Sequence, residues 1–175
     1  MKKRLTILLG FAIILCALIA CGESNNTGTL ASNSPQTQST PAPASHFKAG
    51  DVVKIGDTWQ VTVNSVKTSQ GDEISTPAAG DTYVIVNVTV KNISSQQQAI
   101  SSLLNFTYKA ADGTQGKTAI LTTGTSPAPD GNVAAGDLVK GDLVYEVPAA
   151  QKTGTLSFQA DLTSNGETVW DITVS

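Results

Sequence analysis

Hydrophobic and polar residues alternate along short stretches of the chain from residue 52 onward, and Gly, Asp, Pro and Asn separate these stretches. In residues 82–91, valines occupy every second position from 84 to 90, while Tyr83 and Ile85 lie on the opposite face. A period of two is typical of β-strands, and this strand should be central because one of its ends is apolar on both faces. Further strands are expected at residues 52–55, 58–67, 104–108, 117–122, 143–147, 156–160 and 169–174.

The same pattern predicts the fold class of residues 47–175. Seven to eight short strands with turn residues between them, and no sustained helical period, are typical of an all-β sandwich of two antiparallel sheets. Trp59 shares its parity with Val61 and should pack in the core, the alternative being an exposed aromatic that binds a ligand. Asn92 should end the central strand because asparagine tolerates positive φ.

One strand and one turn are expected to form a hairpin. Leu104, Phe106 and Tyr108 alternate with polar residues and should face inward. The Asp-Gly pair at 112–113 is a strong hairpin signal, which predicts pairing with residues 117–122.

The first 20 residues have the layout of a secretory signal peptide. Lys2, Lys3 and Arg4 precede an apolar run over residues 5–17, and small residues lead to Cys21. The run is too short for a membrane-spanning helix, which needs about 20 apolar residues. We therefore expect residues 1–20 to be removed on export.

Residues 18–21, Leu-Ile-Ala-Cys, resemble the lipobox of bacterial lipoproteins. The resemblance implies that Cys21 is acylated, becomes the first residue of the mature chain and anchors it to the outer face of a bacterial cell membrane. The alternative is an ordinary signal peptide followed by an incidental cysteine. Cys16 lies in the segment expected to be removed, so no disulfide is expected.

Residues 21–46 are rich in Ser, Thr, Asn, Gln, Ala and Pro and contain few apolar residues. Such a composition cannot bury enough surface to offset chain entropy, which predicts a disordered tether. Pro35, Pro41 and Pro43 should stiffen its second half. The single histidine, His46, falls at its end.

Charge excludes one class of partner. Three of the 11 basic residues precede Cys21 whereas all 14 acidic residues follow it, so the mature chain has eight lysines, no arginine and a formal net charge of −6. An acidic domain without arginine is not expected to bind nucleic acid. Anionic headgroups should repel it, which leaves the lipid on Cys21 as the expected membrane contact.

Enzyme chemistry has few candidate residues. Ser-His and Cys-His sites need a histidine fixed beside the nucleophile, and zinc or copper sites need several His, Cys or Met ligands. The sequence has one histidine, His46, in the expected tether. We therefore expect no catalytic residue, no metal site and no cofactor.

Carboxylates are the remaining candidates. Glu146 shares its outward parity with Lys140 and Asp142, and we interpret this row as a solvated strand face. Calcium is an alternative, because oxygen ligands from converging loops suffice to bind it. The acidic residues that could converge are Asp72, Glu73 and Asp81, or Asp130 and Asp137. Without an Asp-x-Asp-x-Asp-Gly run, solvated turn residues are the preferred interpretation.

Three stretches carry a family resemblance. They are Gly-x-x-Trp-x-Val-x-Val-Asn-Ser-Val at 56–66, Tyr-Val-Ile-Val-Asn-Val-Thr-Val-Lys-Asn at 83–92 and Ala-Ala-Gly-Asp-x-Val-x-Gly-x-Leu-Val-Tyr-Glu-Val-Pro at 134–148. The domain resembles a family of immunoglobulin-like domains in bacterial lipoproteins, related to the mycobacterial immunoprotective extracellular protein. The resemblance implies the architecture and supplies no activity.

We therefore expect a lipid-anchored, non-enzymatic binding or interaction module outside the cytoplasm. Its candidate surfaces are the long connections at residues 68–80, 93–102 and 123–136, and its partner would be an envelope or extracellular protein. The alternatives are a structural envelope protein or an accessory subunit of an envelope complex, and an envelope hydrolase.

Overall fold

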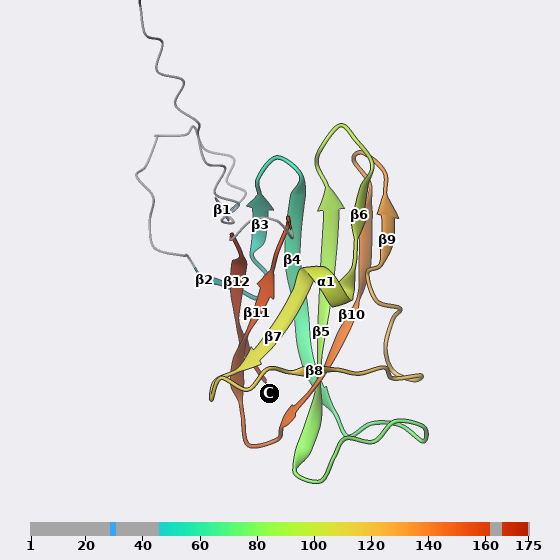
Figure 1. Cartoon of the computed structure of the whole chain (residues 1–175), viewed down its shortest axis with the longest axis vertical. Helices are drawn as coiled ribbons and strands as arrows, with labels where there is room; N and C mark the ends of the chain where they lie inside the picture. Colours follow the sequence, from blue (N-terminus) through green and yellow to red (C-terminus); the bar gives the residue numbers. More distant parts are fainter. Residues whose placement is uncertain (1–28, 31–45, 162–165, 175) are drawn as a thin grey trace, which may run out of the picture.

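The computed structural model describes residues 29–30, 46–161 and 166–174, and these form a β-sandwich (Figure 1). One layer is a six-stranded sheet in the order β1-β3-β4-β5-β10-β8, and the other is a four-stranded sheet in the order β2-β12-β11-β7. The first sheet contains β1 (Thr29–Leu30), β3 (Val52–Ile55), β4 (Trp59–Ser69), β5 (Asp81–Asn92), β10 (Leu138–Pro148) and β8 (Lys117–Thr118). The second contains β2 (His46–Lys48), β12 (Thr168–Thr173), β11 (Thr153–Phe158) and β7 (Phe106–Ala110).

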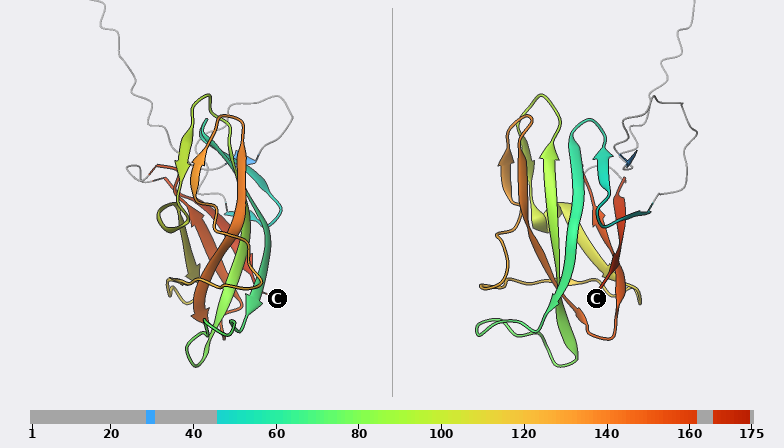
Figure 2. Two further views of the ribbon diagram at one scale, coloured as in Figure 1. Left: turned by 90° about the vertical axis from the view of Figure 1, so that its right-hand side faces the viewer. Right: turned by 180° about the vertical axis from the view of Figure 1, so that it is seen from behind.

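Three short elements lie outside these two sheets. A small third sheet pairs β6 (Gln98–Ile100) with β9 (Gly131–Val133), and the helix α1 (Ser102–Asn105) leads into β7. None of the helices in the described part of the chain is long and apolar enough to span a membrane. The edge-on view in Figure 2 (left) shows the two layers, with β4, β5 and β10 on one side and β7 and β11 on the other.

The predicted central strand is confirmed. β5 pairs with β4 on one side and β10 on the other, both antiparallel. Its alternate valines are fully buried between the sheets, and Tyr83 and Ile85 on its opposite face are also buried. The strand is therefore apolar on both faces at one end, as its sequence predicts.

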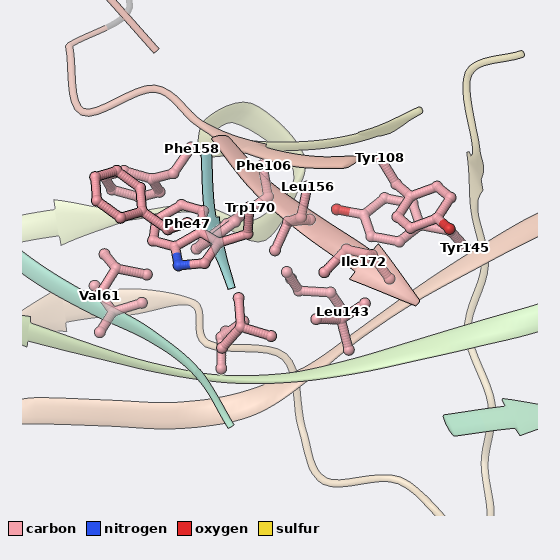
Figure 3. Close-up of a cluster of buried hydrophobic side chains, with 14 of the residues drawn as sticks. Phe47, Val61, Phe106, Tyr108, Leu143, Tyr145, Leu156, Phe158, Trp170 and Ile172 are labelled. Carbon is pink, nitrogen blue, oxygen red and sulfur yellow. The ribbon is translucent and has the colours of Figure 1, made fainter. Parts of the chain in front are cut away.

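Aromatic side chains join the two layers (Figure 3). Trp170 of β12 is fully buried, and its ring centroid lies 6.1 Å from that of Phe47. Tyr108 of β7 stacks on Tyr145 of β10 with centroids 5.5 Å apart, so this pair bridges the sheets. Burial raises the pKa of both tyrosine hydroxyls. Trp59 is 2 % exposed, which confirms its predicted place in the core.

The predicted hairpin is wrong beyond its turn. Asp112 does form a tight turn, because its carboxylate accepts a hydrogen bond from the Thr114 N–H at 2.8 Å and Gly113 has a φ of 89°. Lys117–Thr118 then leaves β7 and pairs with β10 in the other sheet. Leu104 also departs from the prediction, since it lies in α1 and is 62 % exposed.

Asn92 ends the central strand through its side chain and not through positive φ. Among the described residues, positive φ is confined to glycines. The fully buried Asn92 amide donates to the carbonyls of Gln96 (2.6 Å) and Val133 (2.9 Å), and its oxygen accepts from the Ser94 N–H (2.9 Å). The side chain thus replaces backbone pairing where β5 enters the next loop.

Two elements lie in the segment predicted to be a disordered tether. Thr29–Leu30 forms β1 and pairs antiparallel with Lys54 and Val53 of β3. β2 begins at His46, one residue before the predicted domain boundary, and pairs parallel with β12. These two short pieces are therefore parts of the sheets, a correction to the prediction.

Candidate functional site

A distant loop covers one end of the outer face of the six-stranded sheet, the face turned away from the four-stranded sheet. Tyr83 and Ile85 of β5 and Val144 of β10 point outward there and bury their side chains with Leu121. Leu121 belongs to residues 119–130, which connect β8 to β9 and which we name the strap; Figure 1 shows this connection crossing the lower part of the sandwich. Because the outward positions at this end are apolar, their burial stabilises the strap on the sheet.

Asp72 fixes the first half of the strap. Its Oδ2 accepts hydrogen bonds from Thr122 N (2.7 Å), Thr122 Oγ1 (2.9 Å) and Thr123 N (3.2 Å). Its Oδ1 accepts from Ser75 N (2.7 Å) and Ile74 N (3.0 Å) within its own loop. These donors, those of Ser75 and Thr122 first, hold the pKa of the Asp72 carboxyl well below its ordinary value of 3.8.

The second half of the strap returns along the edge of β10. Asp142 Oδ2 accepts a hydrogen bond from Ser126 N at 2.7 Å, and the Asp142 N–H donates to the Pro127 carbonyl at 3.4 Å. Gly141 makes this close approach possible, because a Cβ there would lie 2.7 Å from Pro129 N. At the end of the strap, the Asp130 carboxylate accepts hydrogen bonds from Ser102 N (2.5 Å) and Ser102 Oγ (3.1 Å).

A groove of about 510 Å³ remains between the strap and the outward side chains of β4, β5 and β10. We name it the outer-face groove. Strand pairing explains its floor, because Ser65, Asn87 and Asp142 are direct neighbours across the three strands. Its lining residues are Ser65, Lys67, Ile85, Asn87, Gly124, Thr125, Ser126, Lys140 and Asp142.

A chain of hydrogen bonds holds the floor of the groove in one arrangement. A β-bulge in β4 between Val63 and Ser65 adds Asn64, whose amide donates to Asn87 Oδ1 and to Thr89 Oγ1, each at 2.9 Å. The Asn87 amide in turn donates to Asp142 Oδ1 at 2.6 Å. Bulges re-aim side chains, and this one aims Asn64 at Asn87 and thereby orients Asn87 toward Asp142.

Two lysines border the groove. Lys67 Nζ donates to the Gly124 carbonyl in the strap at 2.7 Å, which places its ammonium at the rim. Lys140 lies on β10 two residues before Asp142, on the same face, and is exposed. The groove therefore combines one carboxylate in its floor with two ammonium groups at its border.

The prediction of a solvated face on β10 is wrong at two positions. Asp142 is only 7 % exposed because the strap covers it. The Glu146 side chain is 13 % exposed, and its carboxylate accepts a hydrogen bond from Ala78 N at 2.7 Å and lies 3.8 Å from Lys117 Nζ. Parity identified the outward side chains, but the residues that cover them come from loops remote in sequence.

The calcium alternative has no geometric support in the described residues. No group of three or more His, Cys, Asp or Glu side chains gathers there, so Asp72, Glu73 and Asp81 do not form a cluster. The oxygens of Asp72 face backbone donors, and those of Asp130 face Ser102. Asp137 lies in a turn, where its N–H donates to Ala134 O at 3.1 Å.

His46, predicted to end the tether, is the first residue of β2. Its Nδ1 lies 2.7 Å from Asp171 Oδ1, and both side chains are about half exposed. The pair therefore joins β2 to β12 at the surface of the four-stranded sheet.

The three loops predicted as candidate surfaces are connected through one of them. Residues 123–136 contact residues 68–80 through the Thr123–Asp72 hydrogen bond, and they contact residues 93–102 through the pairing of β9 with β6. Sequence reasoning missed the groove residues on the strands. Asn87 is a polar residue on the outward face of β5 that also carries Tyr83 and Ile85, and this signal is present in the sequence. The outward orientation of Ser65 depends on the bulge at Asn64, and the partners in the strap depend on the tertiary fold.

Cys21, the predicted lipid attachment site, lies outside the described residues, as do the predicted signal peptide and most of the predicted tether.

A family model described as "Domain of unknown function (DUF4352)" matches residues 47–169. The chain belongs to this family. The match covers the sandwich from Phe47 in β2 into β12, so the family is defined over the domain that carries the outer-face groove. No curated protein sequence matches the chain.

Solved structures share the fold. A putative lipoprotein of Bacillus subtilis, ycdA, has a TM-score of 0.58 at 18% identity, over 67% of this chain and 37% of its own. The yjhA protein of the same organism has a TM-score of 0.59 at 18% identity, over 74% of this chain and 99% of its own. MPT63, a secreted protein from Mycobacterium tuberculosis, has a TM-score of 0.48 at 18% identity, over 69% of this chain and 84% of its own.

The family match and the likeness to ycdA and yjhA confirm the predicted family resemblance and the predicted β-sandwich. The chain spans little more than a third of ycdA. At these identities the likeness shows the fold alone.

Proposed function

We propose that this DUF4352 protein is a lipid-anchored extracytoplasmic binding module without catalytic activity, and that the outer-face groove is its binding surface. The proposal goes beyond the family relationship, because the family is described as a domain of unknown function and a shared fold does not name a ligand. In this proposal Cys21 anchors the chain to the membrane, and the outer-face groove recognises the ligand.

The observation that carries the proposal is the preorganised floor of the groove. Asn87 and Asp142 are held in fixed orientations by Asn64 and by the backbone of Ser126, and the strap above them is fixed by Asp72. Binding sites are concave and hold a few polar groups in place before the ligand arrives, which lowers the entropic cost of binding. A rigid strand floor with a loop along its border meets this description.

Anchoring is supported by the order of segments in the sequence. A positively charged start, an apolar run and the Leu-Ile-Ala-Cys motif precede the domain, and a fold relative, ycdA, is described as a putative lipoprotein. The acidic charge after Cys21 would keep the domain away from anionic headgroups, so that its surface stays accessible.

The proposal is tested by photo-crosslinking in living cells that express the chain with a photo-reactive residue introduced at one position. One variant carries the photo-reactive side chain at Ser126, which lines the groove and whose structural contact is made by its backbone N–H. The matched control carries it at Thr107, an exposed position on β7 in the other sheet. We expect a distinct cross-linked product from position 126 that is absent from position 107.

Identical products from both positions, or none from position 126, would contradict a binding role for the groove. The second result would favour the alternative of a structural envelope protein.

A further inference from the structure

The carboxylate in the floor of the outer-face groove has no cationic partner among the residues that the structure describes. Asp142 is 7 % exposed, and its two oxygens accept hydrogen bonds from the Asn87 amide and the Ser126 N–H, which are both neutral. Among the described residues, no lysine or histidine forms an ion pair with it within 4.0 Å. Buried charges are ordinarily paired, so this carboxylate is suited to a cationic group supplied from outside.

The two lysines at the border supply the opposite charge. Lys67 Nζ uses one hydrogen bond on the Gly124 carbonyl, which leaves further N–H donors of its ammonium unused. The ammonium of Lys140 has no hydrogen-bond or ion-pair partner within the described parts of the chain. Both groups are therefore available to an anionic group of a ligand.

The charges on the groove decide between ligand classes. A polyanion would meet the Asp142 carboxylate, and like charges brought together oppose binding. An uncharged sugar would leave the carboxylate and both ammonium groups unpaired, and none of the lining side chains is aromatic and able to stack on its ring. A ligand that carries both charges can pair with the carboxylate of the floor and with an ammonium group of the border.

The spacing of these residues sets the size of the ligand. Lys140 and Asp142 are two residues apart on one strand face, which separates their Cα atoms by roughly 7 Å. Lys67 lies two strands away from Asp142 and, by the pairing register, two residues further along the strands, at roughly 12 Å between Cα atoms. An extended dipeptide spans about 7 Å between its ends, so its two charged termini match the separation of Lys140 and Asp142.

We propose that the outer-face groove binds a zwitterionic ligand of the amino-acid or short-peptide type, with its ammonium at Asp142 and its carboxylate at Lys140. This proposal rests on the proposed function, since it names the ligand chemistry of the same groove.

The test is equilibrium dialysis of the purified full-length chain in detergent micelles with labelled glycylglycine. N-acetyl-glycylglycine lacks the ammonium and glycylglycinamide lacks the carboxylate, and free glycine distinguishes a single amino acid from a peptide. We expect saturable binding of glycylglycine, with each of the two blocked peptides weakened about tenfold or more, because hydrogen bonds to charged groups contribute strongly. Tighter binding of glycine than of glycylglycine would assign the site to free amino acids.

Variants locate the binding in the groove. Lys140→Gln changes an exposed side chain and should weaken glycylglycine binding about twofold to fivefold, as loss of an exposed ion pair does. The matched control is Lys152→Gln, an exposed lysine outside the groove, which should bind as the unchanged chain does. Asp142→Asn should weaken binding about tenfold or more, with circular dichroism to establish that the variant is folded.

Equal binding of N-acetyl-glycylglycine, or equal binding by the Lys140 and Lys152 variants, would overturn the proposal. So would the absence of saturation by any zwitterion up to about 10 mM, which is weaker than a site with several specific contacts provides. In that last case, a cross-linked product specific to position 126 would preserve the proposed function and reject only the ligand class. Failure of both experiments would reject the groove as a binding site.

Discussion

Asp72 Oδ2 lies 2.7 Å from Thr122 N and 2.9 Å from Thr122 Oγ1, so one carboxylate joins two loops whose residues are 50 positions apart in the sequence. The contact holds the strap against the sheet beside the outer-face groove. Because the other carboxylate oxygen is bound by the loop that contains Asp72, the two loops are fixed relative to each other as well as to the sheet.

Replacing Asp72 should loosen the strap in a pH-dependent way. Hydrogen bonds to the carboxylate lower its pKa in the folded state below the ordinary value of 3.8. Its contribution to stability is therefore present above the unfolded pKa and is lost as the pH falls below that value toward the folded pKa. We expect Asp72→Ala to lower the Tm at neutral pH, and the difference from the unchanged chain to shrink as the pH falls below 3.8.

Glu73→Ala is the matched control for this measurement, because Glu73 is the neighbouring carboxylate and is exposed. Its Tm should equal that of the unchanged chain at every pH. Equal losses in the two variants, or a loss for Asp72→Ala that does not depend on pH, would show that the hydrogen bonds of Asp72 do not hold the strap.

Gly141 should tolerate no side chain. A Cβ at this position would lie 2.7 Å from Pro129 N and would also meet the carbonyl of Pro127, both in the backbone of the strap. Backbone cannot rotate away as a flexible side chain can, so we expect Gly141→Ala to cost about 1–3 kcal/mol of unfolding free energy. Urea unfolding measures this cost, and Lys140→Ala, on the neighbouring exposed residue, should remain within about 0.5 kcal/mol of the unchanged chain. A neutral Gly141→Ala would mean that the strap does not pass against β10.

Asn92 should be essential to the end of β5 although it is polar. Its amide is fully buried and donates hydrogen bonds to the carbonyls of Gln96 and Val133. Both carbonyls would lose this donor in Asn92→Ala. Leaving buried polar groups unsatisfied costs about 1–3 kcal/mol. Asn132→Ala, at an exposed position of β9, serves as the control in the same urea titration. If both variants unfold at the same urea concentration, the buried hydrogen bonds of Asn92 contribute nothing.

The core is tested by two apolar side chains that differ in burial. Phe158 is fully buried and its ring centroid lies 4.9 Å from that of Phe106, whereas Leu103 is 68 % exposed on α1. Phe158→Ala should cost about 3–5 kcal/mol, and Leu103→Ala less than about 0.5 kcal/mol. Comparable losses would be incompatible with the assignment of the inner faces of the sheets.

The parts of the fold that could be predicted are those in which the sequence pattern reports burial directly. The alternate valines of β5 and the parity of Trp59 identify inward faces, because alternation along a strand follows from the backbone alone. Leu104 was misplaced because a four-residue helix is too short to produce a helical period.

The candidate site could be predicted only in part. The outward parity of Asp142 follows from the sequence, but its burial depends on the strap, which folds back over it, and on Gly141, which allows the close approach. The role of Asn64 depends on a bulge, which shifts the register by one residue and leaves no clear mark in the sequence. Contacts of this kind are set by packing between distant segments and not by local pattern.

The proposed role of the domain requires attachment to the membrane through Cys21, and metabolic labelling with a fatty-acid analogue tests this requirement most directly. The chain provides its own control, because Cys16 is the other of its two cysteines and lies in the apolar run expected to be removed. We expect label on the unchanged protein and on Cys16→Ser, and none on Cys21→Ser. Label that persists on Cys21→Ser would contradict the lipid anchor.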